Sequence, residues 1–361
     1  NNYLRTVYDE YNHLSNLLIL RCRWDFQFIC TIISRVEENI YRIKSEILDT
    51  DNDIKIKNIS LGLGDSHNKG KTVSIITFSD DSKIVYKPRT MELELGFNKY
   101  LEFLNSKSND RNYDLYTMKL ISYEDYGFCE FVKHDECMSL EEVKNFYYKT
   151  GKLLAALYSL NAKDIHHENI IARGLEPIVI DLEALFHSDI TLIDKKFFKS
   201  IEVAQKIIDS SVYSIGFLPQ KISNPFETES SKYVDVSAFG GEENQLAPFK
   251  AFKVVNENTD EIKIEKVDGF IEVQSNNPKV NGNVVKSEDY VEEIKRGFSD
   301  GYEVIVDNKI ESEMTIRNIF SGMKNRFILR PTYIYGQLIH TSYHPDFMRS
   351  EMHRYILLHR L

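Results

Sequence analysis

The sequence has little cysteine and no long apolar run. Only four of its 361 residues are cysteine, at positions 22, 30, 129 and 137, and no two of them form a Cys-x-x-Cys pair. So few cysteines in a chain of this length do not make a disulfide framework and fit free thiols in a reducing compartment. The longest apolar runs, such as 153–160, are far shorter than the ~20 residues that a membrane-spanning helix needs, and no signal-peptide pattern opens the chain. We therefore expect a cytoplasmic protein without a membrane span.

The sequence also lacks a basic stripe. Its 55 acidic and 45 basic residues give a net charge of -10, and a nucleic-acid partner would need a local cluster of Lys and Arg that is not found. The hydrophobic content of 42% over 361 residues is sufficient for a large core in two or three structural units. Whether the chain is a whole protein or part of a longer one stays open.

The pattern of apolar residues predicts a mixed α+β fold. Residues 3–48 carry apolar positions at helical spacing without Gly or Pro, so the chain is expected to begin with helix. The following part is rich in β-type runs, with turn signals at 80–82 and 125–127 and one helix expected over 92–104. The expected strands cover residues 55–61, 73–79, 83–87, 118–123 and 128–132. We therefore predict a small antiparallel sheet with a single helix.

A long helix and a short hairpin are predicted next. Ser139 and Glu142 form a capping box, which predicts a helix that runs to about Asn161. A loop over 162–168 follows, then a strand near Ile170, a turn over 173–177 and a second strand that leads into Asp181. This order is the local layout of a kinase catalytic hairpin. Further expectations are a turn-rich stretch over 223–248, strands near 251–266, a helix after Ser287 and mostly helix over 313–361.

The catalytic hairpin carries the residues that phosphoryl transfer requires. That reaction needs a cation on the nucleotide phosphates, a base near the acceptor hydroxyl and oxygen ligands for magnesium. Asn169 follows Asp164 by five positions, which is the spacing between base and metal ligand in kinase loops, in a form closer to lipid kinases. Asp181, twelve residues further on, takes the place of the second metal ligand. Glu183 is either a further magnesium ligand or a surface acid.

A lysine and a glycine-rich segment precede the hairpin. Lys87 closes a predicted strand, where its ammonium would reach the nucleotide phosphates, although a lysine in such a place is more often a surface residue. The segment 62–70 is predicted to be a loop in which Gly lets backbone amides approach phosphate. Within it, Asp65 and His67 would orient Lys87 or the nucleotide, while the alternative is an ordinary polar turn. ATP and Mg²⁺ are therefore the predicted cofactors.

Four of these segments together resemble the dehydratase domain of class II lanthipeptide synthetases. They read Gly-Leu-Gly-Asp-Ser-His-Asn over 62–68, Val-Tyr-Lys-Pro-Arg over 85–89, Leu-Asn-Ala-Lys-Asp-Ile-His-His-Glu-Asn over 160–169 and Val-Ile-Asp-Leu-Glu over 179–183. The similarity covers most of 8–190 and resumes at 326–332 and on to 344–346. The stretch between 191 and 310 matches weakly.

The resemblance implies a kinase-like fold that dehydrates a precursor peptide carrying a leader segment. Ser and Thr of the peptide would be phosphorylated from ATP, and elimination of phosphate would leave dehydroalanine or dehydrobutyrine. The positions implied in phosphorylation are Asp65, His67, Lys87, Asp164, His166, Asn169 and Asp181. Those implied in elimination are Arg326 and Thr332. Magnesium would be held by Asn169 and Asp181.

The chain departs from that family in two ways. It ends before the zinc-containing cyclase domain of the family, and the N-terminal part of the dehydratase is short, so cyclisation is not predicted for this chain and would need a further domain or a partner. The fold class predicted is an atypical, lipid-kinase-like protein kinase with a small antiparallel N-lobe sheet, a mostly helical C-lobe and added helical segments. The predicted divisions are a helical segment 1–52, an N-lobe 53–138, the catalytic hairpin 139–190, an insert or activation region 191–312 and a helical segment 313–361 that carries the elimination residues.

Two other functions remain as alternatives. A plain kinase acting on a lipid, sugar or peptide would use the hairpin around Asp164 and Asp181 but would not need Arg326 or Thr332. A pseudokinase or peptide-binding scaffold would not turn over ATP.

Overall fold

The fold is taken from a computed structural model. It describes residues 2–108, 110–187, 199–220, 222–223, 233–240, 245–271, 275–326 and 332–359. The chain divides into two compact units, each assembled from separate stretches of sequence. Unit 1 consists of Asn1–Met91, Lys119–Phe131 and Arg326–Leu361, and unit 2 of Glu92–Met118 and Val132–Asn325.

Unit 1 is built on a five-stranded antiparallel sheet whose strands are hydrogen-bonded in the order β1-β2-β3-β5-β4. The strands are β1 Ile56–His67, β2 Lys71–Phe78, β3 Lys83–Lys87, β4 Leu120–Ser122 and β5 Gly127–Glu130. The small sheet predicted from the sequence is therefore confirmed, and β3 has the predicted bounds. The β2–β3 turn lies at the predicted Asp-Asp-Ser signal, where Asp80 Oδ1 accepts a hydrogen bond of 3.0 Å from the Ser82 amide.

Strand β1 is longer than predicted. It continues to His67, and only Asn68, Lys69 and Gly70 form the turn to β2. Register shifts on both sides of Leu63 break the pairing with β2, and the glycines at 62 and 64 have positive φ values of 82° and 67°. Glycine adopts such angles without steric cost, so the predicted glycine-rich loop is a bulged strand end.

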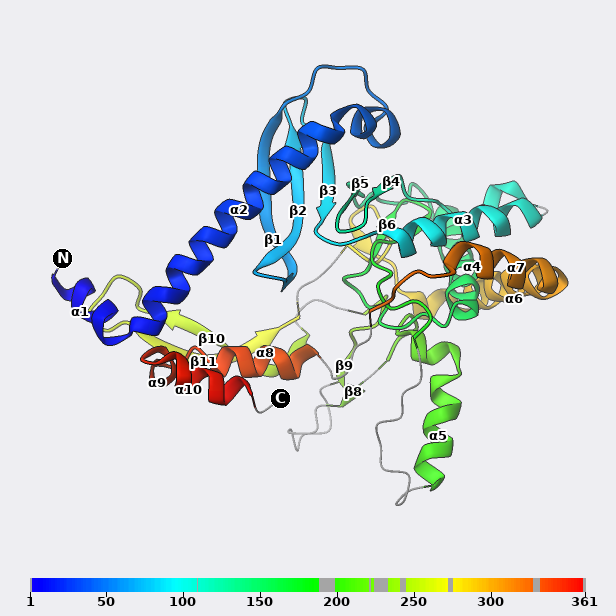
Figure 1. Ribbon diagram of the computed structural model, residues 1–361. Helices are drawn as coiled ribbons and strands as arrows, with labels where there is room; N and C mark the ends of the chain where they lie inside the picture. Colours follow the sequence, from blue (N-terminus) through cyan, green and yellow to red (C-terminus); the bar gives the residue numbers. More distant parts are fainter. Residues whose placement is uncertain are drawn as a thin grey trace. The chain divides into compact units, whose positions relative to one another are not determined.

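The helices of unit 1 come from both ends of the chain (Figure 1). They are α1 Asn2–Glu10, α2 Asn12–Arg42, its continuation η1 Ile43–Leu48, α8 Thr332–Thr341, α9 Pro345–Met348 and α10 Glu351–Leu358. Phe28, Ile32 and Val36 recur one helical turn apart on α2 and are buried against sheet residues such as Ile76 and Phe128. The N-terminal helix and the C-terminal helical content were both predicted.

A tyrosine and arginine cluster fixes α2 to the sheet. Arg35 donates a hydrogen bond of 2.6 Å to the Tyr86 hydroxyl, forms an ion pair with Asp125 and lies 3.9 Å from the ring centre of Tyr126. Tyr123 stacks on Tyr126 at 4.5 Å. Because Tyr86 immediately precedes Lys87, this cluster fixes the end of β3.

The two ends of the chain also meet within unit 1. Arg349 and Glu10 form an ion pair of 2.8 Å, and α2 contacts α9. His13 on α2 is buried near Arg354 and Glu351 of α10, and burial, together with the charge of Arg354, lowers the pKa of its imidazole. This junction is therefore sensitive to the charge of one histidine.

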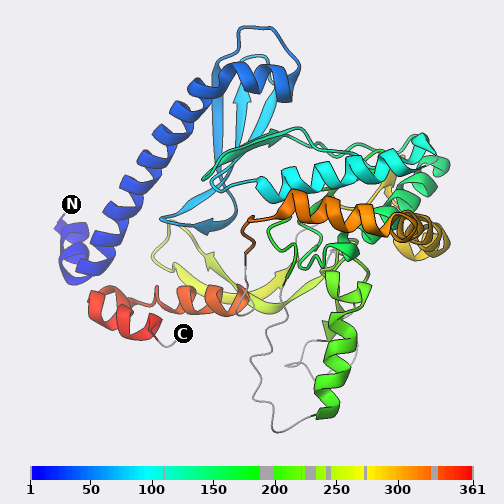
Figure 2. The same ribbon diagram turned by 45° about the vertical axis from the view of Figure 1, so that its right-hand side comes forward.

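Unit 2 is mostly helical, with short two-stranded sheets. Its helices are α3 Glu92–Lys107, η2 Arg111–Tyr113, α4 Leu140–Ser159, α5 Lys199–Asp209, η3 Val212–Ile215, η4 Ser287–Tyr290, α6 Val291–Asp307 and α7 Lys309–Phe320. Its paired strands are β6 Ile170–Arg173 with β7 Glu176–Val179, β8 Ile222–Ser223 with β9 Tyr233–Val234, β10 Leu246–Val255 with β11 Lys263–Phe270, and β12 Lys279–Val280 with β13 Asn283–Val284. Helices α3 and α7 lie side by side (Figure 2).

The core of unit 2 forms around α4. The helix begins as predicted, because Ser139 Oγ accepts a hydrogen bond of 3.2 Å from the Glu142 amide. It ends at Ser159, and thirteen of its residues are buried, from Val143 to Leu157. Helix α6 crosses it at glycines, and the buried side chains of α3, α4, β6 and β7 belong to one hydrophobic cluster. Together these elements give the mixed α+β fold expected from the sequence.

Within the described parts of the chain, no helix is both long enough and apolar enough to cross a membrane.

Candidate functional site

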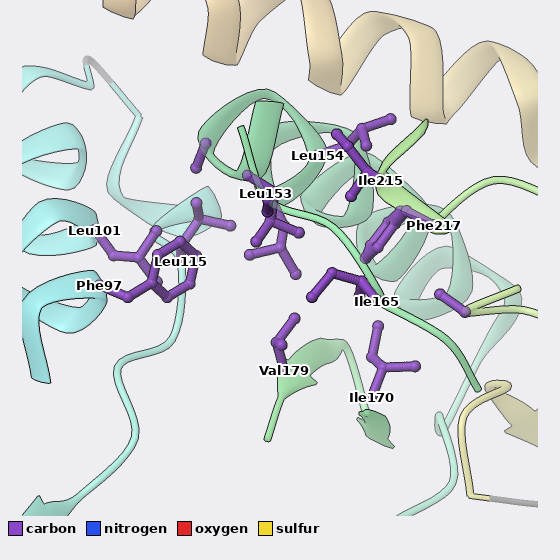
Figure 3. Packing of buried hydrophobic residues seen from close by; sticks show 14 of the residues in the cluster. Phe97, Leu101, Leu115, Leu153, Leu154, Ile165, Ile170, Val179, Ile215 and Phe217 are labelled. Carbon is purple, nitrogen blue, oxygen red and sulfur yellow. The ribbon is translucent and has the colours of Figure 1, made fainter. Parts of the chain in front are cut away.

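The segment that follows α4 is anchored to the core of unit 2 by buried apolar side chains. Ile165 and Ile170 are nearly inaccessible to solvent, and Figure 3 shows them in the same cluster as Leu153 of α4 and Val179 of β7. Asp164, directly before Ile165, and Glu168, between the two isoleucines, lie at the surface, whereas His167 is buried. Alternation of buried and exposed residues thus presents the predicted catalytic loop on one side of the core.

The backbone of this loop is fixed by hydrogen bonds to distant segments. The Ile165 amide donates to the Ile215 carbonyl at 3.0 Å, and the His167 amide donates to the Val236 carbonyl at 3.2 Å. His167 Nδ1 lies 3.1 Å from the same carbonyl oxygen, so this nitrogen is the protonated one and the ring serves to hold the loop. Asp164 has a φ of 62°, an unusual angle for a residue with a side chain, which the surrounding bonds maintain.

Asn169 links the loop to the strand that precedes Asp181. Its side-chain Nδ2 donates a hydrogen bond of 2.8 Å to the Asp164 carbonyl, and its own carbonyl accepts one of 2.8 Å from the Ile180 amide. Asp181 follows Ile180 directly, and its Oδ1 accepts a hydrogen bond of 3.1 Å from the Glu183 amide. The structure therefore brings Asp164, Asn169 and Asp181 together within unit 2.

Two further predicted site residues lie in the same segment. His166 Nδ1 accepts a hydrogen bond of 3.3 Å from the Glu168 amide and lies 3.9 Å from the Glu168 carboxylate. Its backbone pairs with Ser237. Glu183 is half-buried, two residues past Asp181.

The hairpin β6–β7 is anchored to α4 by a buried ion pair. Lys149 Nζ lies 2.5 Å from Glu176 Oε1, and the lysine side chain is almost completely buried. Burial raises the pKa of Glu176, while the charge of Lys149 opposes that change. Removing either partner would leave a buried charge uncompensated, so this pair fixes the strand that leads to Asp181.

The sequence did not point to Lys163 as part of this site. Its Nζ donates a hydrogen bond of 2.7 Å to the Asp209 carbonyl and another to Ser214 Oγ, and its amide donates to the Ala184 carbonyl at 3.0 Å. Lys163, which directly precedes Asp164, is therefore hydrogen-bonded to the segment after Asp181 through both its amide and its side chain. Its place next to the predicted base was the signal available in the sequence.

The other predicted site residues lie in unit 1. Lys87 closes β3 opposite Gly127 of β5, and its side chain is 5% exposed, so it is a buried lysine and not a surface one. Asp65 and His67 belong to β1, but their side chains lie outside the described residues. Arg326 is exposed, and Thr332 begins α8 with a side chain outside the described residues.

The residues present suit a magnesium ion shared with a phosphate. Among the described residues, no group of three or more His, Cys, Asp or Glu is placed to hold a metal. Magnesium at phosphate-transfer sites is usually held by one or two protein oxygens together with water and phosphate. Asp181 would supply a carboxylate, and Asn169, whose amide nitrogen donates to the Asp164 carbonyl, would supply its amide oxygen.

Comparison with known proteins supports a family assignment. The chain is 32% identical over 293 residues to the lacticin 481/lactococcin biosynthesis protein LcnDR2 of Lactococcus lactis subsp. lactis. The aligned region covers 78% of the chain and 30% of that relative. The chain thus spans less than a third of the length of this curated relative. The family described as a domain of unknown function, DUF4135, matches residues 11–361. Because this match extends over nearly the whole sequence, the chain belongs to the DUF4135 family.

Proposed function

We propose that the chain is a peptide dehydratase that uses ATP and magnesium to phosphorylate Ser and Thr of a precursor peptide and then eliminates the phosphate. The observation that carries it is the hydrogen-bonded segment in which Asp164, Asn169 and Asp181 lie together. The similarity to a lacticin 481/lactococcin biosynthesis protein supports a peptide substrate of the lantibiotic precursor class. A kinase-like fold, with the sheet of unit 1 and the helical unit 2, is part of the same proposal.

In the first step Asp164 accepts the proton of the acceptor hydroxyl. The hydroxyl oxygen then forms a bond to the γ-phosphorus, and the bond from that phosphorus to the departing ADP oxygen breaks. Asn169 and Asp181 would hold magnesium, which neutralises charge on the phosphates when it is bound. Because Asn169 Nδ2 is bound to the Asp164 carbonyl, base and metal ligand keep a fixed spacing.

The remaining residues of the first step are assigned by their chemistry. Lys87 supplies the cation for the nucleotide phosphates, and Asp65 and His67 orient Lys87 or the nucleotide. His166, whose Nδ1 already accepts the Glu168 amide, has Nε2 left for the peptide or a phosphate. Glu183 is a candidate additional ligand of the nucleotide site.

We assign the second step to Arg326 and Thr332. The proton on Cα leaves to a base, the Cβ–O bond breaks, and a double bond between Cα and Cβ forms as inorganic phosphate departs. A phosphorylated Ser or Thr carries about -1.5 to -2 charges near neutral pH, and a planar guanidinium binds its oxygens through two parallel hydrogen bonds. Arg326 would therefore stabilise the leaving group.

One experiment tests both steps. The chain is incubated with ATP, magnesium and the Ser/Thr-rich peptide encoded beside its gene, and the peptide mass is measured over time. The expected product is a dehydrated peptide, and a peptide carrying one phosphoryl group should appear transiently before it. A phosphopeptide that never loses phosphate would indicate a plain kinase, and an unchanged peptide without ATP turnover would indicate a peptide-binding scaffold.

Variants separate the proposed roles. Asp164→Asn should slow phosphorylation by about 10² to 10⁴, the usual contribution of a general base, and Asp181→Asn should abolish it through loss of the metal ligand. Glu168→Gln removes an exposed carboxylate from the same loop and is the matched control. Phosphorylation at the parent rate in both Asp variants would show that the assignment is wrong.

The elimination step has its own variants. Arg326→Ala and Thr332→Ala should phosphorylate the peptide and accumulate the phosphopeptide, since only the second step is impaired. Lys324→Ala, which removes an exposed charge two residues away, should behave as the parent. Normal dehydration in the Arg326 and Thr332 variants would contradict the assignment.

A further inference from the structure

Unit 2 contains a cavity on the side of the catalytic segment that faces α7. Its volume is about 520 Å³, within the range of small-ligand and side-chain pockets. It lies where the end of α7 approaches the start of α3 and the residues after Asp181. The lining residues are Leu93, Phe186, Ile316, Arg317, Phe320, Ser321, Met323 and Asn325. We call this cavity the α7 groove.

The walls of the α7 groove are held in place by packing and hydrogen bonds. The rings of Phe186 and Phe320 meet edge to face, with centres 4.8 Å apart. Phe320 also packs so closely on Gly96 of α3 that a Cβ there would lie 2.6 Å from its Cε1. Asn325 Nδ2 donates to the carbonyls of Leu185 and Phe186 at 3.0 and 3.1 Å. The groove is thus built onto the segment that carries Asp181.

The chemistry of the α7 groove is apolar with a single cation. Five of its eight lining residues are apolar, counting Met323, and Arg317 is the charged residue among them. Arg317 is exposed, and within the described residues no carboxylate forms an ion pair with its guanidinium. On a chain with a net charge of -10, an unpaired arginine beside an apolar groove favours a ligand that combines apolar groups with a carboxylate.

We propose that the α7 groove is a docking site for a segment of the peptide substrate that carries aliphatic side chains next to Asp or Glu. This inference rests on the proposed function, because it takes the occupant to be the peptide that the catalytic segment modifies. Docking outside the reacting residues would hold the peptide while its Ser and Thr residues reach the catalytic loop in turn. Apolar burial would supply the affinity, and Arg317 would fix the orientation of the segment.

Binding can be measured without turnover. The probe is a fluorescein-labelled synthetic peptide that carries Leu and Glu at helical spacing. Its fluorescence anisotropy is measured as the full chain is added without ATP. Two matched probes replace every Glu by Gln or every Leu by Ser. The protein variants are Arg317→Glu, Arg317→Lys and Lys309→Glu, the last of which makes the same charge reversal at the other, exposed end of α7.

Arg317→Glu should raise the dissociation constant about tenfold, since it replaces an attraction by a repulsion at a partly exposed site. Arg317→Lys should retain most of the affinity, and Lys309→Glu should bind as the parent does. Both altered probes should bind more weakly to the parent protein. An unchanged affinity in Arg317→Glu, an equal loss in Lys309→Glu, or no binding of the Leu/Glu probe to the parent would each overturn the inference.

The same variants keep this inference separate from the proposed function. If Arg317→Glu binds the probe normally while ATP-dependent phosphorylation proceeds, the groove assignment is wrong and the proposed function stands. If the probe binds through Arg317 but no peptide is phosphorylated by the parent, the docking site stands and the proposed function is wrong.

Discussion

A single methyl group at Gly297 should destabilise unit 2, because α4 and α6 cross there at backbone contact. A Cβ on Gly297 would lie 1.9 Å from the Tyr148 carbonyl oxygen, and one on Gly151 would lie 2.1 Å from the Ile294 carbonyl oxygen. Both obstacles are backbone atoms of helices, which cannot rotate away as a side chain could. The Gly297→Ala methyl would therefore force the two helices apart by about 1.5 Å to reach an ordinary contact distance.

The magnitude follows from two opposing effects. Overpacking of a close-packed core typically costs about 1–3 kcal/mol, and this contact lies at the severe end because two helix backbones must move. Alanine in a helix offsets about 1 kcal/mol of that cost, because glycine has the lower helix propensity. We expect a net loss of about 2 kcal/mol in the free energy of unfolding for Gly297→Ala.

Gly336→Ala provides a control of opposite sign. Gly336 lies in α8, and a Cβ there would meet no atom within 4 Å, so the same substitution should stabilise by about 0.5–1 kcal/mol. Urea denaturation followed by circular dichroism measures both variants. Fluorescence of Trp24, the single tryptophan of the chain, reports separately on α2 of unit 1. A Gly297→Ala protein as stable as the parent would refute the close crossing.

Three further substitutions test other parts of the fold. Arg35→Leu should lower the free energy of unfolding by about 2–4 kcal/mol, because it leaves the buried Tyr86 hydroxyl without its 2.6 Å donor and removes the cation over the Tyr126 ring. A coupling energy of zero with Tyr86→Phe, measured in a double-mutant cycle by urea denaturation, would contradict this. Burial lowers the pKa of His13, so its contribution to docking α9 and α10 is complete above the unfolded pKa near 6.5 and is lost as the pH falls below it. The hydrogen-exchange protection of residues 345–358, relative to the intrinsic exchange rate at each pH, should therefore fall on acidification in the parent but not in His13→Asn. Ser139→Ala should cost about 1 kcal/mol by removing the cap of α4, measured by thermal unfolding, whereas Ser139→Asp should retain the parent stability.

Local patterns in the sequence were sufficient for the elements that rely on short-range chemistry. Strand β3 has the predicted bounds, and α4 begins at the predicted cap, because alternation and capping depend on residues within a few positions of each other. The order of Asp164, Asn169 and Asp181 also identified the segment that the structure brings together. The roles of these residues remain predictions, as do the cofactors and the elimination residues.

The tertiary structure decided what joins distant parts of the chain. The glycines of β1 gave no sign from spacing that they would sit in a bulged strand, because the bulge depends on the register of pairing with β2. Periodicity likewise did not predict that the helices after Arg326 would join the N-terminal ones, or that Gly151 and Gly297 would meet. The sequence by itself determined which residues are apolar, capped or charged within each element. Which elements pack together depends on the fit of complementary surfaces far apart in the chain, and that fit exists only in the folded protein.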